Sequence, residues 1–226
     1  MTGDELLAEI AILKDEAKIE RDTGAYSDAI ERLSEAIALI DDSQWDDGAT
    51  ATRLDDVQKR VAWQLADCLG MLGGNYRRLQ QLDEAIQCFE RGRLYEQDPR
   101  FQIYSSYNTV NSIIAPIEEG LRDAASQSTE LRAAVLMLER QIFDPGDGET
   151  SRRLDRWAWA DLGQCRLLLG NLDEARIAYQ HFIELSDAAS IQSSRNVLLR
   201  IKNALQAKND DCAEVVEVGI KLLTTV

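Results

Sequence analysis

A seven-residue pattern occurs three times in this chain and constrains its fold more than any other feature. It reads GAYSDAI at 24–30, QQLDEAI at 80–86 and GNLDEAR at 170–176. Each copy lies between two apolar segments with helical spacing, so each predicts the bend of a helical hairpin. Repeated hairpins stack into arrays that usually bind other molecules rather than transform them.

The three copies also share a register. In each, a small residue of the first helix precedes an alanine of the second helix by the same interval, which lets two helix backbones approach closely. A large apolar residue follows each alanine by one turn. The triplets are Ala17, Ala29 and Leu33; Gly73, Ala85 and Phe89; and Gly163, Ala175 and Tyr179.

These residues resemble the tetratricopeptide repeat (TPR) family, which stacks hairpins of about 34 residues. The third copy, with Trp159, Gly163 and Tyr179, is the best match, whereas Gln80 stands where a glycine is usual. The resemblance implies an all-α fold: a right-handed superhelical array of about five antiparallel hairpins in one domain. We expect these hairpins near 2–40, 52–97, 101–143, 153–186 and 189–226.

The segments between the copies depart from the repeat. An acidic loop at 41–48 contains Trp45, and a helix longer than a repeat needs is predicted from about Thr52 to Leu79. A helix is predicted from Phe101 to Ala115, with Pro116 kinking or stopping it before it continues to Ala125.

Composition limits the partners. The net charge of -15 argues against nucleic acid and anionic membrane surfaces, which attract Lys and Arg. Residues 1–5 show no signal peptide, and no apolar run is long enough to cross a bilayer. The four cysteines are scattered in helical apolar patterns, which predicts buried free thiols and a cytoplasmic location.

Catalysis finds little support in the sequence. The single histidine, His181, falls on a predicted solvated helix face, and no His/Cys spacing suits a metal. The acidic loops at 41–48 and 144–149 lack the alternating oxygen ligands of a calcium loop. We therefore expect a non-enzyme with no cofactor and no metal.

The TPR resemblance implies that the first helices of successive hairpins line a concave groove. The groove residues it implies are Lys14, Lys18, Arg21, Met71, Gly74, Arg77, Arg78, Trp157, Asp161, Gln164 and Leu168. Such a partly basic groove favours an acidic or C-terminal peptide with an apolar anchor near Trp157. The alternative is that these charges only solvate a helix face.

A second candidate surface lies between the second and third copies. Its residues are Tyr104, Tyr107, Asn108, Asn111 and Ser112, which cluster at helical spacing. Asparagine and tyrosine can hydrogen-bond a peptide backbone. The alternative is the polar side of an ordinary helix.

The last helix predicts an oligomer. Its apolar residues, among them Val215, Val218, Leu222 and Val226, span an arc of roughly 220°, about twice the stripe that one-sided packing needs. We expect it to pack against a second copy, as a homodimer, or against a partner. The alternative is that it packs on its own array through several contacts.

The sequence as a whole indicates a cytoplasmic adaptor or scaffold that binds a protein or peptide in its groove. A peptide-responsive regulatory sensor and an obligate subunit of a bacterial signalling or defence enzyme complex remain alternatives.

Overall fold

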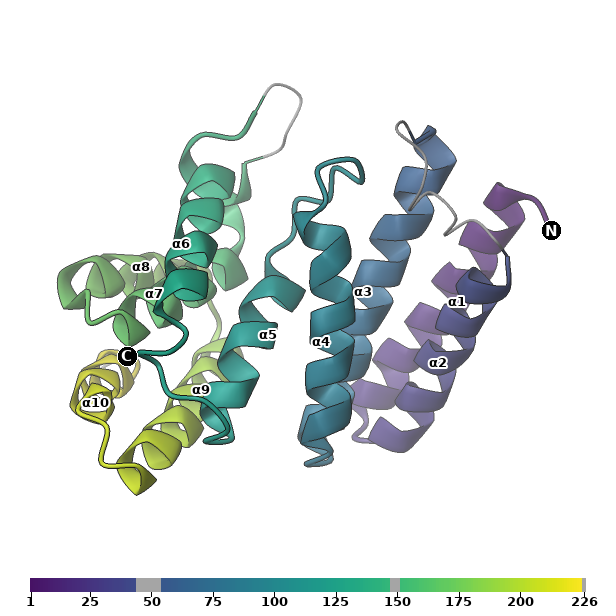
Figure 1. The fold of residues 1–226 in the computed structure, drawn as a ribbon. Helices are drawn as coiled ribbons and strands as arrows, with labels where there is room; N and C mark the ends of the chain where they lie inside the picture. Colours follow the sequence, from purple (N-terminus) through teal and green to yellow (C-terminus); the bar gives the residue numbers. More distant parts are fainter. Residues whose placement is uncertain (44–53, 147–150, 225–226) are drawn as a thin grey trace. The chain divides into compact units, whose positions relative to one another are not determined.

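The computed structural model describes residues 1–43, 54–146 and 151–224, and these residues form helices joined by short turns (Figure 1). The predicted all-α fold class is confirmed. The helices are α1 Gly3–Asp22, α2 Tyr26–Asp42, α3 Asp56–Arg78, α4 Leu82–Gln97, α5 Tyr107–Glu118, α6 Ser128–Phe143, η2 Arg152–Leu154, α7 Arg156–Leu168, α8 Leu172–Leu185, α9 Ala188–Ala207 and α10 Cys212–Leu222. Trp45 and most of the acidic loop around it lie outside the described residues.

The chain divides into two compact units, Met1–Ser112 and Ile113–Val226, with the boundary inside α5. Each unit is described by itself. That all repeats form one domain therefore stays a prediction.

The first unit contains the hairpins α1/α2 and α3/α4, and α3 also packs on α1 and α2. Helix α1 starts with a capping box, in which Thr2 and Glu5 exchange side-chain hydrogen bonds to each other's backbone N–H. Its bend needs a left-handed residue, which Gly24 provides at φ +84°. Ala17, Ala29 and Leu33 are fully buried where the two helices cross, as the shared register predicts.

The second hairpin repeats this crossing with a glycine and an aromatic ring. A Cβ on Gly73 would lie 2.6 Å from the ring of Phe89, so only glycine fits between the two helices. Gln80 takes the left-handed position of this bend at φ 61°, where the other two copies have Gly24 and Gly170.

Three helix limits differ from the sequence prediction. Helix α3 begins at Asp56 rather than near Thr52, because Asp55 caps it by accepting a hydrogen bond from the Gln58 N–H. The helix predicted from Phe101 begins at Tyr107, since the Phe101 and Ile103 side chains turn into a cluster with Leu54, Ala62 and Ala66. This helix runs through Pro116 and ends at Glu118, short of the predicted Ala125.

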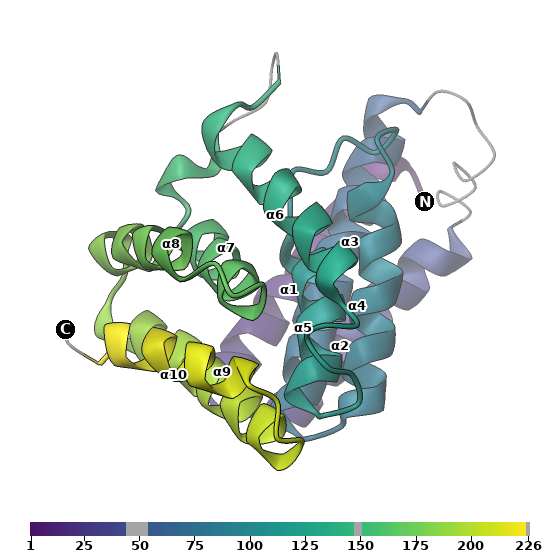
Figure 2. The same cartoon turned by 60° about the vertical axis from the view of Figure 1, so that its left-hand side comes forward.

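The second unit contains α6, η2 and the helix pairs α7/α8 and α9/α10. In α7/α8 a Cβ on Gly163 would lie 3.0 Å from the ring of Tyr179, the same crossing as in the second copy. The final helix, α10, packs along α9 and also contacts α7 and α8 (Figure 2). Among the described residues, no helix combines the length and the apolar character that a membrane span needs.

Candidate functional site

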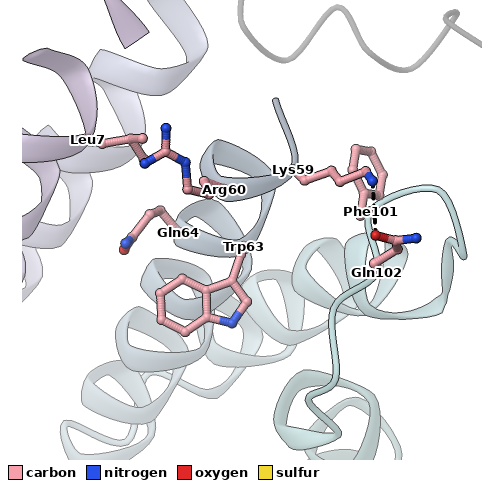
Figure 3. A pocket seen from close by; sticks show the side chains of 7 residues that line it. All are labelled: Leu7, Lys59, Arg60, Trp63, Gln64, Phe101 and Gln102. Atoms are coloured by element: carbon pink, nitrogen blue, oxygen red, sulfur yellow. Dashed lines mark hydrogen bonds between the residues drawn. The ribbon is translucent and has the colours of Figure 1, made fainter. Parts of the chain in front are cut away.

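A pocket of the first unit lies where α1, α3 and the segment before α5 meet. Its cavity measures about 400 Å³ (Figure 3). It is lined by Leu7 of α1, by Lys59, Arg60, Trp63 and Gln64 of α3, and by Phe101 and Gln102. The cavity size suits one or two side chains of a bound segment.

Trp63 is the exposed aromatic side chain of this pocket. It is 46% exposed, although a tryptophan gains by burying its large apolar surface. The Lys14 ammonium lies over its ring at 4.9 Å from the centroid, which fixes one side of the indole by a cation–π contact. Arg60, which also lines the pocket, forms an ion pair with Asp4 of α1 at 3.0 Å.

Lys14 is not the free groove cation that the sequence suggested. Its side chain is buried, its Nζ donates a hydrogen bond to Gln64 Oε1 at 2.6 Å, and it forms an ion pair with Asp67. Helical spacing within α1 could not reveal these partners, because both lie on α3. Lys14 therefore joins α1 to α3 and supports the indole of Trp63.

The other two α1 cations are paired within their own helix. Lys18 donates to Asp15 Oδ1 at 2.9 Å, and this hydrogen bond, with the lysine charge, holds the pKa of Asp15 below its ordinary value. Arg21 pairs with Asp22 at 2.8 Å. Such exposed pairs hold little energy, so both cations remain available to a partner at small cost.

The α3 and α5 candidates are brought together. Arg77 Nη1 donates to Asn111 Oδ1 at 2.9 Å, and the half-exposed ring of Tyr107 lies over Gly70 and Gly74. Arg78 is exposed; it donates to the Gly74 carbonyl at 2.9 Å.

The remaining α3 and α5 candidates differ in their neighbours and in how far their side chains are exposed. The Arg78 guanidinium lies 5.7 Å from the ring of Tyr26. Met71 is half-buried against the core of the unit, and Tyr104 is 42% exposed.

Asn108, in contrast, is a packing residue and not a surface for peptide. It is 2% exposed, and its Nδ2 donates to the Ala66 carbonyl at 2.8 Å and to Glu96 Oε1 at 3.1 Å. Glu96 also accepts the backbone N–H groups of Asn108 and Thr109, so this buried carboxylate caps α5. A Cβ on Gly92 would lie 2.4 Å from the Asn108 amide carbon, which explains a glycine in the middle of α4.

The α7 candidates form a separate set in the second unit. Trp157 is 40% exposed, with its ring 6.0 Å from that of Phe182 and the Arg156 guanidinium 5.7 Å from its centroid. Gln164 is half-buried, and its Nε2 has no hydrogen-bond partner among the residues that the structure describes. This set offers an aromatic side chain and an amide.

The apolar arc of α10 is largely used inside its own unit. Ala213, Val216, Gly219 and Ile220 are buried. Val215, Val218 and Leu222 are half-buried, and Val226 lies outside the described residues. Packing on three helices accounts for an arc wider than one-sided packing needs, whereas the homodimer itself stays a prediction.

The side chains that most often carry chemistry in proteins are, in this chain, the four cysteines and the single histidine. All four cysteines are free, and burial raises the pKa of Cys68 to about 12 and of Cys88 and Cys212 to about 11. His181 stacks on Trp159 with 4.3 Å between ring centroids. Within 1–43, 54–146 and 151–224, no group of three or more His, Cys, Asp or Glu side chains could hold a metal ion.

Comparison with known families agrees with the repeated hairpins. Residues 66–92 and 158–188 match the sequence model of the tetratricopeptide repeat, which places one match on α3/α4 and one on α7/α8. The chain is a TPR-like helical-repeat protein. Repeats of this type support a general role as a protein-interaction scaffold.

Two solved structures illustrate how distant the similar proteins are. A Podosopora anserina protein described as a kinesin light chain with nearly identical TPR-like repeats shares 15% identity at a TM-score of 0.45, covering 96% of this chain and 95% of its own. BtubC (BKLC) from P. vanneervenii shares 15% identity at a TM-score of 0.39, covering 100% and 92%. No curated protein matches the chain significantly. The assignment therefore rests on the matched repeats and the helical hairpins.

The sequence reasoning missed the pocket around Trp63. It assigned groove residues on α3 only from Met71 onward, inside the repeat. Continuing the same helical period over the three preceding turns leads to Asp67, Trp63 and Lys59, so the signal was present in the long helix. Phe101 and Gln102 could not be found this way, because the segment before α5 is not helical.

Proposed function

We propose that this protein is a non-enzymatic adaptor that binds a segment of a partner protein in the pocket around Trp63. The observation that carries the proposal is a half-exposed tryptophan over a cavity of about 400 Å³, on the first helix of a TPR-like hairpin. Aromatic side chains in such settings dominate binding energy at protein interfaces. The cytoplasmic location inferred from the thiols belongs to the same proposal.

A protein partner fits this surface better than nucleic acid. The chain carries 40 Asp and Glu against 25 Lys and Arg, and its net charge of -15 repels phosphates. Of the cations of α1, the buried Lys14 is held in an ion pair with Asp67 and is not open to a phosphate.

The test uses the full chain with an affinity tag, captured from a lysate of the source cells. Trp63→Ala is compared with Trp157→Ala, since the two tryptophans are exposed to a similar extent on first helices of two hairpins. We expect Trp63→Ala to release a partner that wild type and Trp157→Ala retain, because loss of an anchor of this kind costs about 2 kcal/mol or more. Equal capture by all three proteins would contradict the proposal.

The homodimer through α10 is a separate prediction. Val215, Val218 and Leu222 remain half-buried after packing within the unit, so they offer a narrow apolar strip. Light scattering of the full chain, compared with Val215→Asp and Leu222→Asp, tests it. A strictly monomeric wild-type protein at high concentration would remove the dimer.

A further inference from the structure

One side of α1, the purple helix of Figure 1, is exposed along its length. Seven residues of α1, and no others, fall within an arc of about 120° when the helix is projected at 100° per residue, and all seven are exposed. We call them the α1 outer face: Glu5, Ala8, Glu9, Ile12, Asp15, Glu16 and Ile19. Its two isoleucines are 56% and 66% exposed and lie about 10 Å apart along the helix.

The shared register shows what the same two positions do in the other copies. We count from the small residue at each helix crossing to find the counterparts of Ile12 and Ile19 in α3 and α7. All four counterparts are fully buried: Cys68 and Asn75 in α3, and Ala158 and Cys165 in α7. The two exposed isoleucines of α1 therefore stand at positions that the array covers elsewhere.

Helix α3 shows which kind of element covers this face. Its buried residues there belong to one apolar cluster with side chains of α1 and α2, and α2 packs along α3. These residues are Val61, Leu65, Cys68 and Leu72. The cover is thus a helix of the preceding hairpin. Terminal repeats usually turn a polar face to solvent, whereas α1 keeps two large apolar side chains at this place.

The remaining positions of the α1 outer face are acidic. Where α3 has Val61, Leu65 and Leu72, α1 has three glutamates, Glu5, Glu9 and Glu16. Together with Asp15 they give the face four carboxylates and no cation. A helix that covers this face must therefore offer apolar side chains to the isoleucines and positive charge to the carboxylates around them.

Neighbouring cations compensate this charge only in part. Lys18 pairs with Asp15 at 2.9 Å, and Arg32 of α2 lies 3.3 Å from Glu16. Glu5 accepts the Thr2 backbone N–H at 2.7 Å. Glu9 forms no ion pair within residues 1–43, 54–146 and 151–224. All of these groups are at the surface, where such pairs exchange partners at small cost.

We propose that the α1 outer face binds a basic amphipathic helix of a partner protein, which packs along α1 as α2 packs along α3. Apolar residues seven positions apart on the partner helix contact Ile12 and Ile19, and Lys or Arg side chains beside them meet the carboxylates. The same face of a second copy is a poor occupant, because like charges would oppose each other. Leu7, which lines the Trp63 pocket, lies outside the arc, so this surface is separate from the pocket.

The test uses the full-length protein and a fluorescently labelled, alanine-rich peptide of eighteen residues, a composition that favours helix. The probe has Leu at positions 6 and 13, on one stripe, and Lys on both flanks of that stripe. One companion has Glu in place of every Lys, and another has Ser in place of both Leu. We expect only the probe with Leu and Lys to bind, and its affinity should fall in high salt.

Protein variants locate the binding surface. Ile12→Ser combined with Ile19→Ser should weaken binding of the probe about tenfold, because both side chains lie at the centre of the contact. Glu9→Gln should weaken it about threefold, as loss of an exposed ion pair does. Leu94→Ser and Glu90→Gln are the matched controls, since both residues are exposed on α4. Melting temperatures of all variants should stay near that of wild type.

The outcomes keep this inference apart from the proposed function. Trp63→Ala should bind the probe as wild type does, whichever partner depends on Trp63. Equal binding of the Lys and Glu peptides, or unchanged affinity in the double isoleucine variant, would overturn the basic helix. Loss of self-association in that variant, without any effect on the probe, would assign the face to a second copy and also overturn it.

Discussion

The hairpins α3/α4 and α7/α8 share one core and differ in what they add to it. In both, a glycine of the first helix faces a buried aromatic ring of the second, Gly73 with Phe89 and Gly163 with Tyr179. However, α3 extends about three turns further from this crossing toward its N-terminus than α7 does. Those added turns contain Lys59 and Trp63. The repeat register therefore fixes the core, and the residues outside it provide the candidate site.

The largest effect should come from emptying the shared core. Phe89→Ala and Tyr179→Ala each remove a fully buried ring and should lower the free energy of unfolding by about 3–5 kcal/mol. Urea unfolding followed by circular dichroism measures both. Phe89→Leu is the milder control. A loss below about 1 kcal/mol for either alanine variant would show that the two crossings are not equivalent.

The one chemical difference between the two rings predicts a smaller effect. The Tyr179 hydroxyl is buried and has no hydrogen-bond partner within the described part of the chain, and burial raises its pKa well above the ordinary value. Tyr179→Phe makes the α7/α8 crossing like that of α3/α4 and should raise the free energy of unfolding by about 1 kcal/mol, since an unsatisfied buried group is removed. A decrease would mean that the hydroxyl has a partner in solution.

The bends of the two hairpins predict a change in stability of similar size. Gln80 holds the left-handed conformation at φ 61° that Gly170 holds at φ +78° in the other hairpin. Gln80→Gly should therefore stabilise the protein by about 1 kcal/mol, and Gly170→Gln should destabilise it by about as much. Melting temperatures of the two reciprocal variants test this; shifts of the same sign would contradict it.

The smallest difference between the two hairpins is expected in the reactivity of their buried thiols. Cys68 on α3 and Cys165 on α7 are buried, and burial raises the pKa of both, in Cys68 to about 12. Only about one Cys68 thiol in ten thousand is then ionised at pH 8, so alkylation of both should be slow. Cys88 and Cys212, with a pKa of about 11, should react sooner when followed by mass spectrometry. Fast labelling of Cys68 in folded protein would contradict its burial.

The core of the fold could be predicted from the sequence because it depends on local periodicity. The register predicted close helix crossings at Gly73 and Gly163 with a large apolar residue one turn after each alanine, and the structure has the rings of Phe89 and Tyr179 packed against these glycines. The start of α5 could not be predicted, since its cap is the carboxylate of Glu96 on another helix.

The candidate site was predictable only in part. Arg77 and Asn111 are joined by a hydrogen bond, although the sequence had assigned Arg77 to the groove and Tyr107 and Asn111 to a second surface. The role of Lys14 depends on Gln64 and Asp67, which are distant in sequence, so a single-helix pattern assigned it to a solvent-facing groove. Trp63 was within reach of the same periodicity that identified Met71, but it lies outside the repeat that drew attention to α3.

Hydrogen exchange of the captured complex, followed by mass spectrometry, tests the central claim most directly. The same full-length protein is measured free and bound to the partner that depends on Trp63. If the pocket around Trp63 is the binding surface, peptides covering residues 56–78 and 101–107 gain protection, whereas those covering α7 and α10 do not change. Protection confined to α7 or α10 would contradict the account.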